Sequence, residues 1–160
     1  MPVITPDAVE MEDQTASDSP CGPVRMLRYS DSGGLTQFGA FVEVLPPGSR
    51  SSLCHWHLRE DEFVYMLQGE VTLIEGGLAT TLRPGDAATF KAGVAAGHFL
   101  RNDSRDEARY LVVGTRSGAD VVTYPNHDRI LTYDDAAGTE SFTTLDGTPG
   151  VGSAYRIPGA

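Results

Sequence analysis

Two histidines and a nearby carboxylate form the most chemically informative segment of the chain. His55 and His57 are separated by one residue, and Glu62 follows after the short polar link 58–61. Because side chains alternate between the two faces of an extended strand, we expect both imidazoles to point the same way. Glu62 begins a second extended run and can approach the same point. A fourth candidate, His98, follows the glycine-rich bend 93–97 at the start of another expected strand.

Three neutral imidazoles and one carboxylate are ligands typical of a divalent transition metal. They suit Fe, Mn, Ni, Zn or Cu, and would bind Ca or Mg poorly. The alternative is that these residues lie on an exposed strand without a metal, but their joint spacing disfavours it. We therefore predict that His55, His57, Glu62 and His98 bind one metal ion of the Fe, Mn, Ni or Zn type.

These residues resemble the two sequence motifs of the cupin family. The first motif is matched by Gly48, His55, His57, Glu62 and Gly69, and the second by Gly85, Gly93, His98 and Asn102. The chain departs from the pattern in having one extra residue between Gly48 and His55, Lys91 in place of a proline, and two extra residues between Gly93 and His98. The resemblance covers about residues 35–125 and is to small bacterial single-domain cupins that have no agreed reaction. It implies a double-stranded β-helix, or jelly-roll barrel, with the metal inside.

The pattern of short apolar runs and turn residues also predicts an all-β fold, without a convincing helical period. We expect strands over 24–29, 37–45, 53–57, 62–67, 70–75, 78–82, 87–91, 98–102, 109–115 and 120–124. Glycine and proline separate these runs. We divide the chain into an acidic N-terminal arm (1–23), a barrel (24–125) and a C-terminal extension (126–160) that wraps around the barrel. The arm has little to bury and is expected to become ordered only against the barrel or a second subunit.

Composition and charge restrict the partners and the cellular location. The chain has 160 residues and a formal net charge of -10, much of it in the arm, which has no Lys or Arg. Such acidity disfavours nucleic acids and anionic membranes as partners. No apolar stretch is long enough to span a membrane and no signal peptide is recognisable, so we expect a cytoplasmic protein. Cupins often pair through sheet edges, so the resemblance implies a homodimer.

Several other residues invite functional interpretations that have simpler alternatives. Because side chains alternate along a strand, Cys54 is expected to point away from the histidines and to be a core residue. A disulfide between Cys54 and Cys21 is disfavoured. Lys91, the only lysine, is either a base or anion anchor, or an exposed strand end, which we favour. Glu60 and Asp61 are rival carboxylates that we expect to be solvated.

The alternation of side chains along each strand also predicts which residues line the substrate pocket. Val64 and Met66 follow Glu62 inward, Leu100 follows His98, and Leu53 lies beside His55. Such an apolar wall suits a small organic substrate better than a sugar with many hydroxyls.

The predicted function is a metal-dependent enzyme acting on a small oxygenated organic molecule. Among cupin reactions, oxygenase chemistry of the dioxygenase kind is placed slightly ahead of redox-neutral lyase, cyclase or isomerase chemistry. Glu62 is the candidate catalytic residue, because it can leave the metal and act as a general base. The alternative from another class is a cupin that binds a metal or a metabolite without converting it. Metal-free epimerase or dehydratase chemistry is a third possibility, against which the complete ligand set argues.

Overall fold

The protein is described by a computed structural model that covers residues 3–15, 18–150 and 152–156. Three antiparallel sheets make up almost all of the regular structure, which confirms the all-β prediction. The largest sheet has the strand order β1-β2-β3-β10-β5-β8. Its strands are β1 (Met11–Asp13), β2 (Arg25–Leu27), β3 (Phe38–Leu45), β10 (Ala108–Thr115), β5 (Glu62–Gln68) and β8 (Ala87–Phe90).

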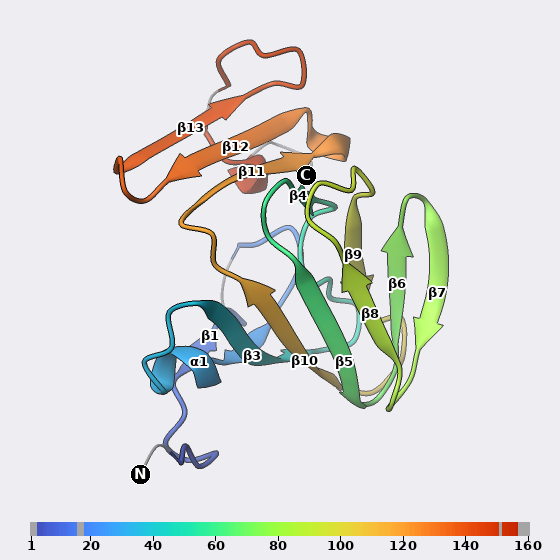
Figure 1. Cartoon of the computed structure of the whole chain (residues 1–160). Coiled ribbons are helices and arrows are strands. Elements are labelled where there is room, and N and C mark those ends of the chain that lie inside the picture. Colours follow the sequence, from blue (N-terminus) through green and yellow to red (C-terminus); the bar gives the residue numbers. More distant parts are fainter. Residues whose placement is uncertain (1–2, 16–17, 151, 157–160) are drawn as a thin grey trace.

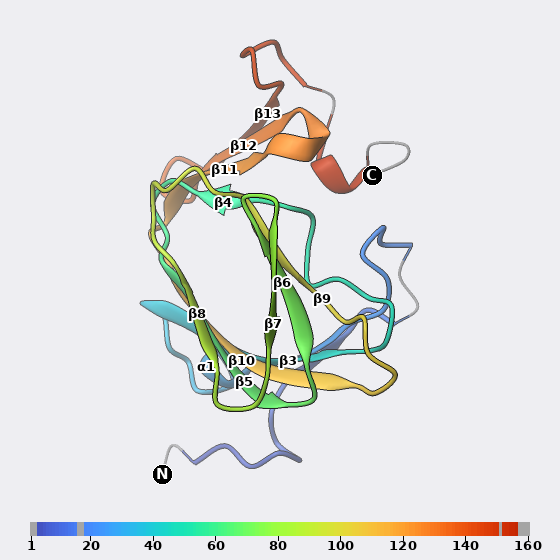
Figure 2. The same cartoon turned by 90° about the vertical axis from the view of Figure 1, so that its right-hand side faces the viewer.

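A second sheet of three strands closes the other side of the barrel. It contains β7 (Leu78–Leu82), β6 (Val71–Glu75) and β9 (His98–Arg101), in that order. The strands of both sheets can be followed in Figure 1, and in Figure 2 β8 of the large sheet lies at the left of the barrel with β6 and β9 of the second sheet to its right. The two sheets thus enclose one interior, as in a jelly roll.

The C-terminal extension forms a hairpin of its own. Strands β12 (Arg129–Asp134) and β13 (Thr139–Thr143) add to β11 (Ala119–Tyr124) and the short β4 (Trp56–His57) in a third sheet. This sheet lies across one end of the barrel (Figure 1). The sequence predicts β11 but neither the hairpin nor β1, which joins part of the acidic arm to the edge of the large sheet.

Helical structure is short and peripheral. Helix α1 (Tyr29–Ser32) follows β2, and two 3-10 turns, η1 (Pro125–His127) and η2 (Ala154–Arg156), flank the extension. Among the described residues, no helix has the length and apolar character needed to cross a membrane.

The core lies between the two walls of the barrel and follows from strict alternation along the strands. On β5, Val64 and Met66 are buried whereas Phe63, Tyr65 and Leu67 are exposed. The inward residues join a cluster that extends across both walls and includes Leu45, Val71, Leu73, Leu100, Tyr110 and Val112. Burial of this apolar surface is the main term that stabilises the barrel.

Gly69 lets β5 turn back tightly into β6. Its φ is +73°, and a Cβ at this position would lie 2.8 Å from the backbone oxygen of Glu107. Any side chain would therefore force the two segments apart. The conformation that Gly69 supplies fixes the end of the strand that carries Glu62.

Candidate metal centre

His55 and His98 lie opposite one another on adjacent backbone segments. The two residues exchange both backbone hydrogen bonds, with N to O distances of 3.2 and 2.9 Å. Side chains of a directly opposed pair project to the same face. Their ring centroids are 5.0 Å apart, which brings two imidazoles together although 43 residues separate them in the chain.

Glu62 reaches the same point from the first residue of β5. It pairs with Phe90 on one side and with Gly114 on the other. One ligand atom from each of His55, Glu62 and His98 lies within 4.8 Å of the other two, and His98 Nε2 is 3.6 Å from Glu62 Oε2. This spacing lets one cation contact all three residues.

The state of His98 provides a test of whether these residues fit a metal. The residue is 4% exposed, and its ring stacks on Phe90 with a centroid distance of 3.6 Å. Within the described part of the chain, neither ring nitrogen has a hydrogen-bond partner. A buried imidazole without partners is costly, and a metal bound to one nitrogen would remove most of that cost. The donor set therefore fits a divalent transition metal.

The protonation states of the other two ligands also fit. His55 donates from Nδ1 to the backbone oxygen of Leu53 at 2.9 Å, which leaves Nε2 free to bind. Burial lowers the pKa of His55 to about 4, so the ring is neutral near neutral pH. Burial would raise the pKa of Glu62, but the contact with His98 and the neighbouring imidazoles outweigh it and lower that pKa. Neutral imidazole and ionised carboxylate are the forms that bind metals.

His57 lies beside this group rather than inside it. Its ring centroid is 5.0 Å from that of His55. Its Nδ1 contacts Oδ2 of Asp120 at 2.6 Å, and Oδ1 of the same carboxylate accepts the Arg59 amide at 2.8 Å. A carboxylate that holds one imidazole nitrogen fixes the ring and leaves the other nitrogen for a metal. Ligation by His57 stays a prediction, and Asp120 is its structural support.

Glu60 is more involved than the sequence suggests. Its Oε1 accepts the backbone and hydroxyl protons of Ser117 at 2.9 and 3.3 Å and the hydroxyl of Tyr133 at 3.2 Å. The residue is half-buried and lines the cavity next to Glu62. It is therefore an anchored carboxylate and not the solvated one expected. Asp61 is exposed, as expected.

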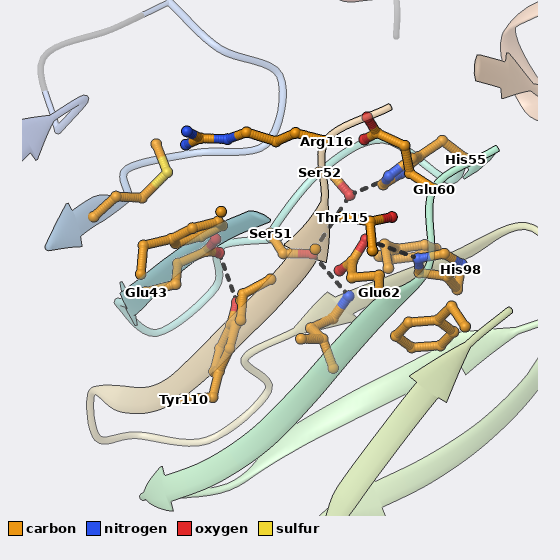
Figure 3. A pocket seen from close by; sticks show the side chains of 18 of the residues that line it. Glu43, Ser51, Ser52, His55, Glu60, Glu62, His98, Tyr110, Thr115 and Arg116 are labelled. Atoms are coloured by element: carbon orange, nitrogen blue, oxygen red, sulfur yellow. Dashed lines mark hydrogen bonds and ion pairs between the residues drawn. The ribbon is translucent and has the colours of Figure 1, made fainter. Parts of the chain in front are cut away.

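The three grouped residues line a cavity of about 350 Å³ inside the barrel. This volume suits a small molecule. In Figure 3, His55, Glu62 and His98 lie at one end, Glu43 and Tyr110 at the other, and Ser51 between them. The lining mixes apolar side chains, among them Phe41, Phe90, Leu100 and Val112, with polar ones, among them Glu43, Ser51, Ser52, Glu60, Tyr110 and Thr115. The lining therefore combines the apolar wall expected from the sequence with polar groups that can bind hydroxyls.

The structure places the four predicted pocket residues differently. Leu100 lines the cavity. Val64 and Met66 do point inward but lie in the packed core, opposite Val112 and Tyr110, and do not reach the cavity surface. Leu53 packs instead in a separate cluster with Cys21, Ala154 and Tyr124. The segment before Trp56 bends and is not a strand, so alternation from His55 does not extend to Leu53.

Three further residues singled out in the sequence, Cys54, Lys91 and Asn102, lie outside the group of candidate ligands. Cys54 is a free thiol next to Gly97, because a Cβ built on Gly97 would lie 2.7 Å from its Sγ. Lys91 is exposed at the end of β8. Asn102 is fully buried and donates to the backbone oxygens of Leu45 and Asp106 at 2.7 and 2.8 Å, which makes it a turn residue.

Sequence reasoning missed Asp120 and Glu43 as site residues. Asp120 lies 63 residues after its partner His57 and reaches it only because β11 pairs with β4. The only local signal was a single charged residue in the otherwise uncharged strand 119–124. Glu43 carries the same signal within β3, and both are buried.

Comparisons with known proteins identify the family to which this fold belongs. The Cupin domain family matches residues 41–114. A sugar phosphate isomerase described as a member of the cupin superfamily, from Silicibacter pomeroyi, is 34% identical, with a TM-score of 0.81 over 93% of this chain and 96% of that one. A putative sugar phosphate isomerase from Acidithiobacillus ferrooxidans is 29% identical, with a TM-score of 0.76 over 84% of each chain.

More distant similarity extends to a predicted oxalate decarboxylase from Thermotoga maritima. It is 23% identical, with a TM-score of 0.60 over 71% of this chain and 97% of that one, and so shares the fold alone. No curated protein matches the sequence. The barrel, the matched family and the most similar structures agree with the motifs around His55 and His98, and the chain therefore belongs to the cupin superfamily.

Proposed function

We propose that the protein is a metal-dependent isomerase that moves a proton between adjacent carbons of a small polyhydroxylated carbonyl compound. The observation that carries this proposal is the position of the His55, Glu62 and His98 group at one end of a cavity that also presents polar side chains, among them Glu43, Ser51 and Tyr110. A hydroxyl-rich substrate needs such side chains, because each buried hydroxyl without a partner is costly. The oxygenase chemistry placed first on sequence grounds does not by itself require polar side chains that pair with several substrate hydroxyls.

The comparisons support the redox-neutral alternative over the oxygenase. The two relatives described as sugar phosphate isomerases resemble this chain over most of its length, at 34% and 29% identity. A shared fold alone does not fix a reaction. Here the likeness extends over 93% of the chain in one case and agrees with the polar lining of the cavity.

The ligand residues and the proton carrier are different carboxylates in this proposal. His55, His57, Glu62 and His98 would hold the ion, which would act as a Lewis acid on the substrate carbonyl. Glu60 lines the same cavity but is outside the group of three. One of its oxygens lies within 4.8 Å of ligand atoms of His57 and Asp120, and its Oε1 is fixed by Ser117 and Tyr133. Its second oxygen can therefore accept a proton without loosening a metal ligand. This assigns to Glu60 the proton transfer that sequence reasoning gave to Glu62.

The reaction balances without an external oxidant. The C–H bond of the hydroxyl-bearing carbon breaks and its proton passes to Glu60, which returns it to the former carbonyl carbon. The hydroxyl proton shifts to the former carbonyl oxygen. An anchored carboxylate close to the reacting carbon typically contributes 10²–10⁴-fold as a general base, to order of magnitude.

The test is conversion of small aldoses and ketoses by protein loaded with Mn(II) or Zn(II), followed by NMR, with dioxygen uptake recorded in parallel. We expect interconversion without dioxygen uptake. Glu60→Gln should lower turnover by about 10²-fold or more with metal content unchanged. The exposed Glu140→Gln on β13 serves as control. Dioxygen uptake coupled to substrate loss would support an oxygenase instead, and stoichiometric binding without conversion would support the binding-protein alternative.

A further inference from the structure

A buried polar pair lies at the end of the cavity away from the metal ligands. Glu43 on β3 and Tyr110 on β10 are directly opposite in the strand register. The Tyr110 hydroxyl donates to Oε1 of Glu43 at 2.6 Å, and the two residues are 5% and 0% exposed. Both line the cavity (Figure 3). Nothing in the packing of an apolar core requires a carboxyl group at this position.

The strand register gives the distance between this pair and the metal ligands. Glu62 is opposite Gly114, and Gly114 is opposite Gly39. Glu43 is four residues further along β3, which corresponds to about 13 Å of strand. Long side chains extend inward from both ends, so a ligand of about five to seven atoms in length can contact both. Ser51 lies between them along the polar wall (Figure 3).

The electrostatics of the Glu43–Tyr110 pair favour an uncharged group of a bound ligand. Burial, together with the charge of Glu62, raises the pKa of Glu43 to about 8 although the Tyr110 hydrogen bond opposes this. The carboxyl group is therefore mostly neutral near neutral pH and can donate as well as accept. Among the described side chains, only Tyr110 hydrogen-bonds to it, so its second oxygen is available to a ligand.

The cationic side chains of the cavity are already engaged. Arg28 contacts Glu12 and Asp31, and Arg116 contacts Asp31 at 2.6 Å. The described lining thus offers a phosphate no unpaired guanidinium, and it contains the carboxylates of Glu60 and Glu62. Apart from the metal ion itself, a phosphate in the cavity would meet these carboxylates without a free cationic side chain to offset them.

We propose that Glu43 and Tyr110 form a second binding point of the cavity, which holds a hydroxyl or carbonyl oxygen of an uncharged substrate. The substrate class is then a neutral polyhydroxylated aldehyde or ketone, with its hydroxy-carbonyl end at the metal and a hydroxyl at Glu43. A phosphorylated sugar should bind less tightly, because the described lining offers its phosphate no unpaired cationic side chain. This inference rests on the proposed function for the metal end, and it departs from the phosphorylated substrates that the descriptions of the two relatives name.

The test compares matched pairs of probes. Dihydroxyacetone, D-xylulose and D-fructose, and the phosphate ester of each, are titrated into Zn(II)-loaded protein and followed by saturation-transfer NMR. We expect at least one neutral compound to bind more than tenfold more tightly than its phosphate. Tyr110→Phe should weaken that binding about tenfold, because it removes one donor from a buried site. Glu43→Gln, which keeps a neutral donor and acceptor, should change it less than threefold.

Several outcomes would overturn the inference. Tighter binding of the phosphates, no binding of any neutral probe, or unchanged binding in Tyr110→Phe would each do so. Loss of binding in folded Glu43→Gln would show that an ionised carboxylate is required, which also contradicts it. Zinc content is measured for every variant. If the wild-type protein retains no zinc, the proposed function fails, whereas full zinc content with unchanged binding in Tyr110→Phe removes only the role of Glu43 and Tyr110.

Discussion

Replacement of Asp120 by asparagine removes the charged partner of His57 and keeps the shape of the side chain. Asp120 is 1% exposed, and its two oxygens accept from His57 Nδ1 and from the Arg59 amide at 2.6 and 2.8 Å. Asparagine has only one acceptor oxygen, so its NH₂ group must face one of these two donors. If the oxygen stays on the backbone amide, His57 loses its orienting partner.

The expected loss is set by the role of such carboxylates at metal sites. Removal of a partner that orients a ligating histidine typically lowers metal affinity 10- to 100-fold, or about 1.4–2.8 kcal/mol. We expect a loss of this size in Zn(II) affinity for Asp120→Asn, measured by competition with a chromophoric chelator near neutral pH. Far-UV circular dichroism establishes that the variant is folded.

Asp103→Asn is the matched control, because Asp103 is an exposed carboxylate that pairs with Arg101 away from the cavity. Its affinity for zinc should equal that of the wild type. A folded Asp120→Asn protein with unchanged affinity would refute the reasoning, since His57 would then bind no metal or need no orienting carboxylate.

Gly97→Ala should weaken zinc binding and lower stability by about 1–3 kcal/mol, because the new Cβ would lie 2.7 Å from Cys54 Sγ, next to His98; thermal unfolding and zinc titration measure this. Cys54→Ala in the same chain should restore part of the loss, and an unaffected single variant would contradict the close packing. Burial raises the pKa of Glu43 from 4.5 to about 8, so its neutral form contributes stability below about pH 4.5 that is lost as pH rises through 8. The stability of Glu43→Gln relative to wild type, from urea unfolding, should therefore rise between these limits, and a constant difference would argue against a neutral carboxyl. The homodimer stays a prediction: light scattering should give twice the chain mass, and Phe63→Glu on the exposed outer face of β5 should give monomers, whereas a monomeric wild type would contradict it.

The strands of the barrel were predictable because their signals are local. Alternation along β5 and the turn at Gly69 are properties of a few adjacent residues. The pairing of β12 with β13 was missed, because the tail has few apolar residues and its turns resemble those of an irregular segment. The hairpin forms because β12 pairs with β11. The sequence does not show that this edge of β11 is available for pairing.

The candidate metal ligands were identifiable for a similar reason, since the spacing of three of them lies within residues 55–62. The cavity depends on distant pairings. Alternation along β5 sends Val64 inward correctly, but Val64 packs in the core with its paired neighbours Val112 and Ala88 and does not line the cavity. Glu43 meets Tyr110 only through the register of β3 with β10, 67 residues apart. Such contacts follow from the register of the whole sheet and leave no local pattern.

Metal analysis of the protein purified without chelator tests the central claim most directly. We predict about one equivalent of iron, manganese, nickel or zinc per chain in the wild type. His98→Ala, which removes a ligand whose nitrogens have no other partner among the described residues, should retain almost none. A wild-type protein that holds no metal even after incubation with each of these ions would contradict the metal centre.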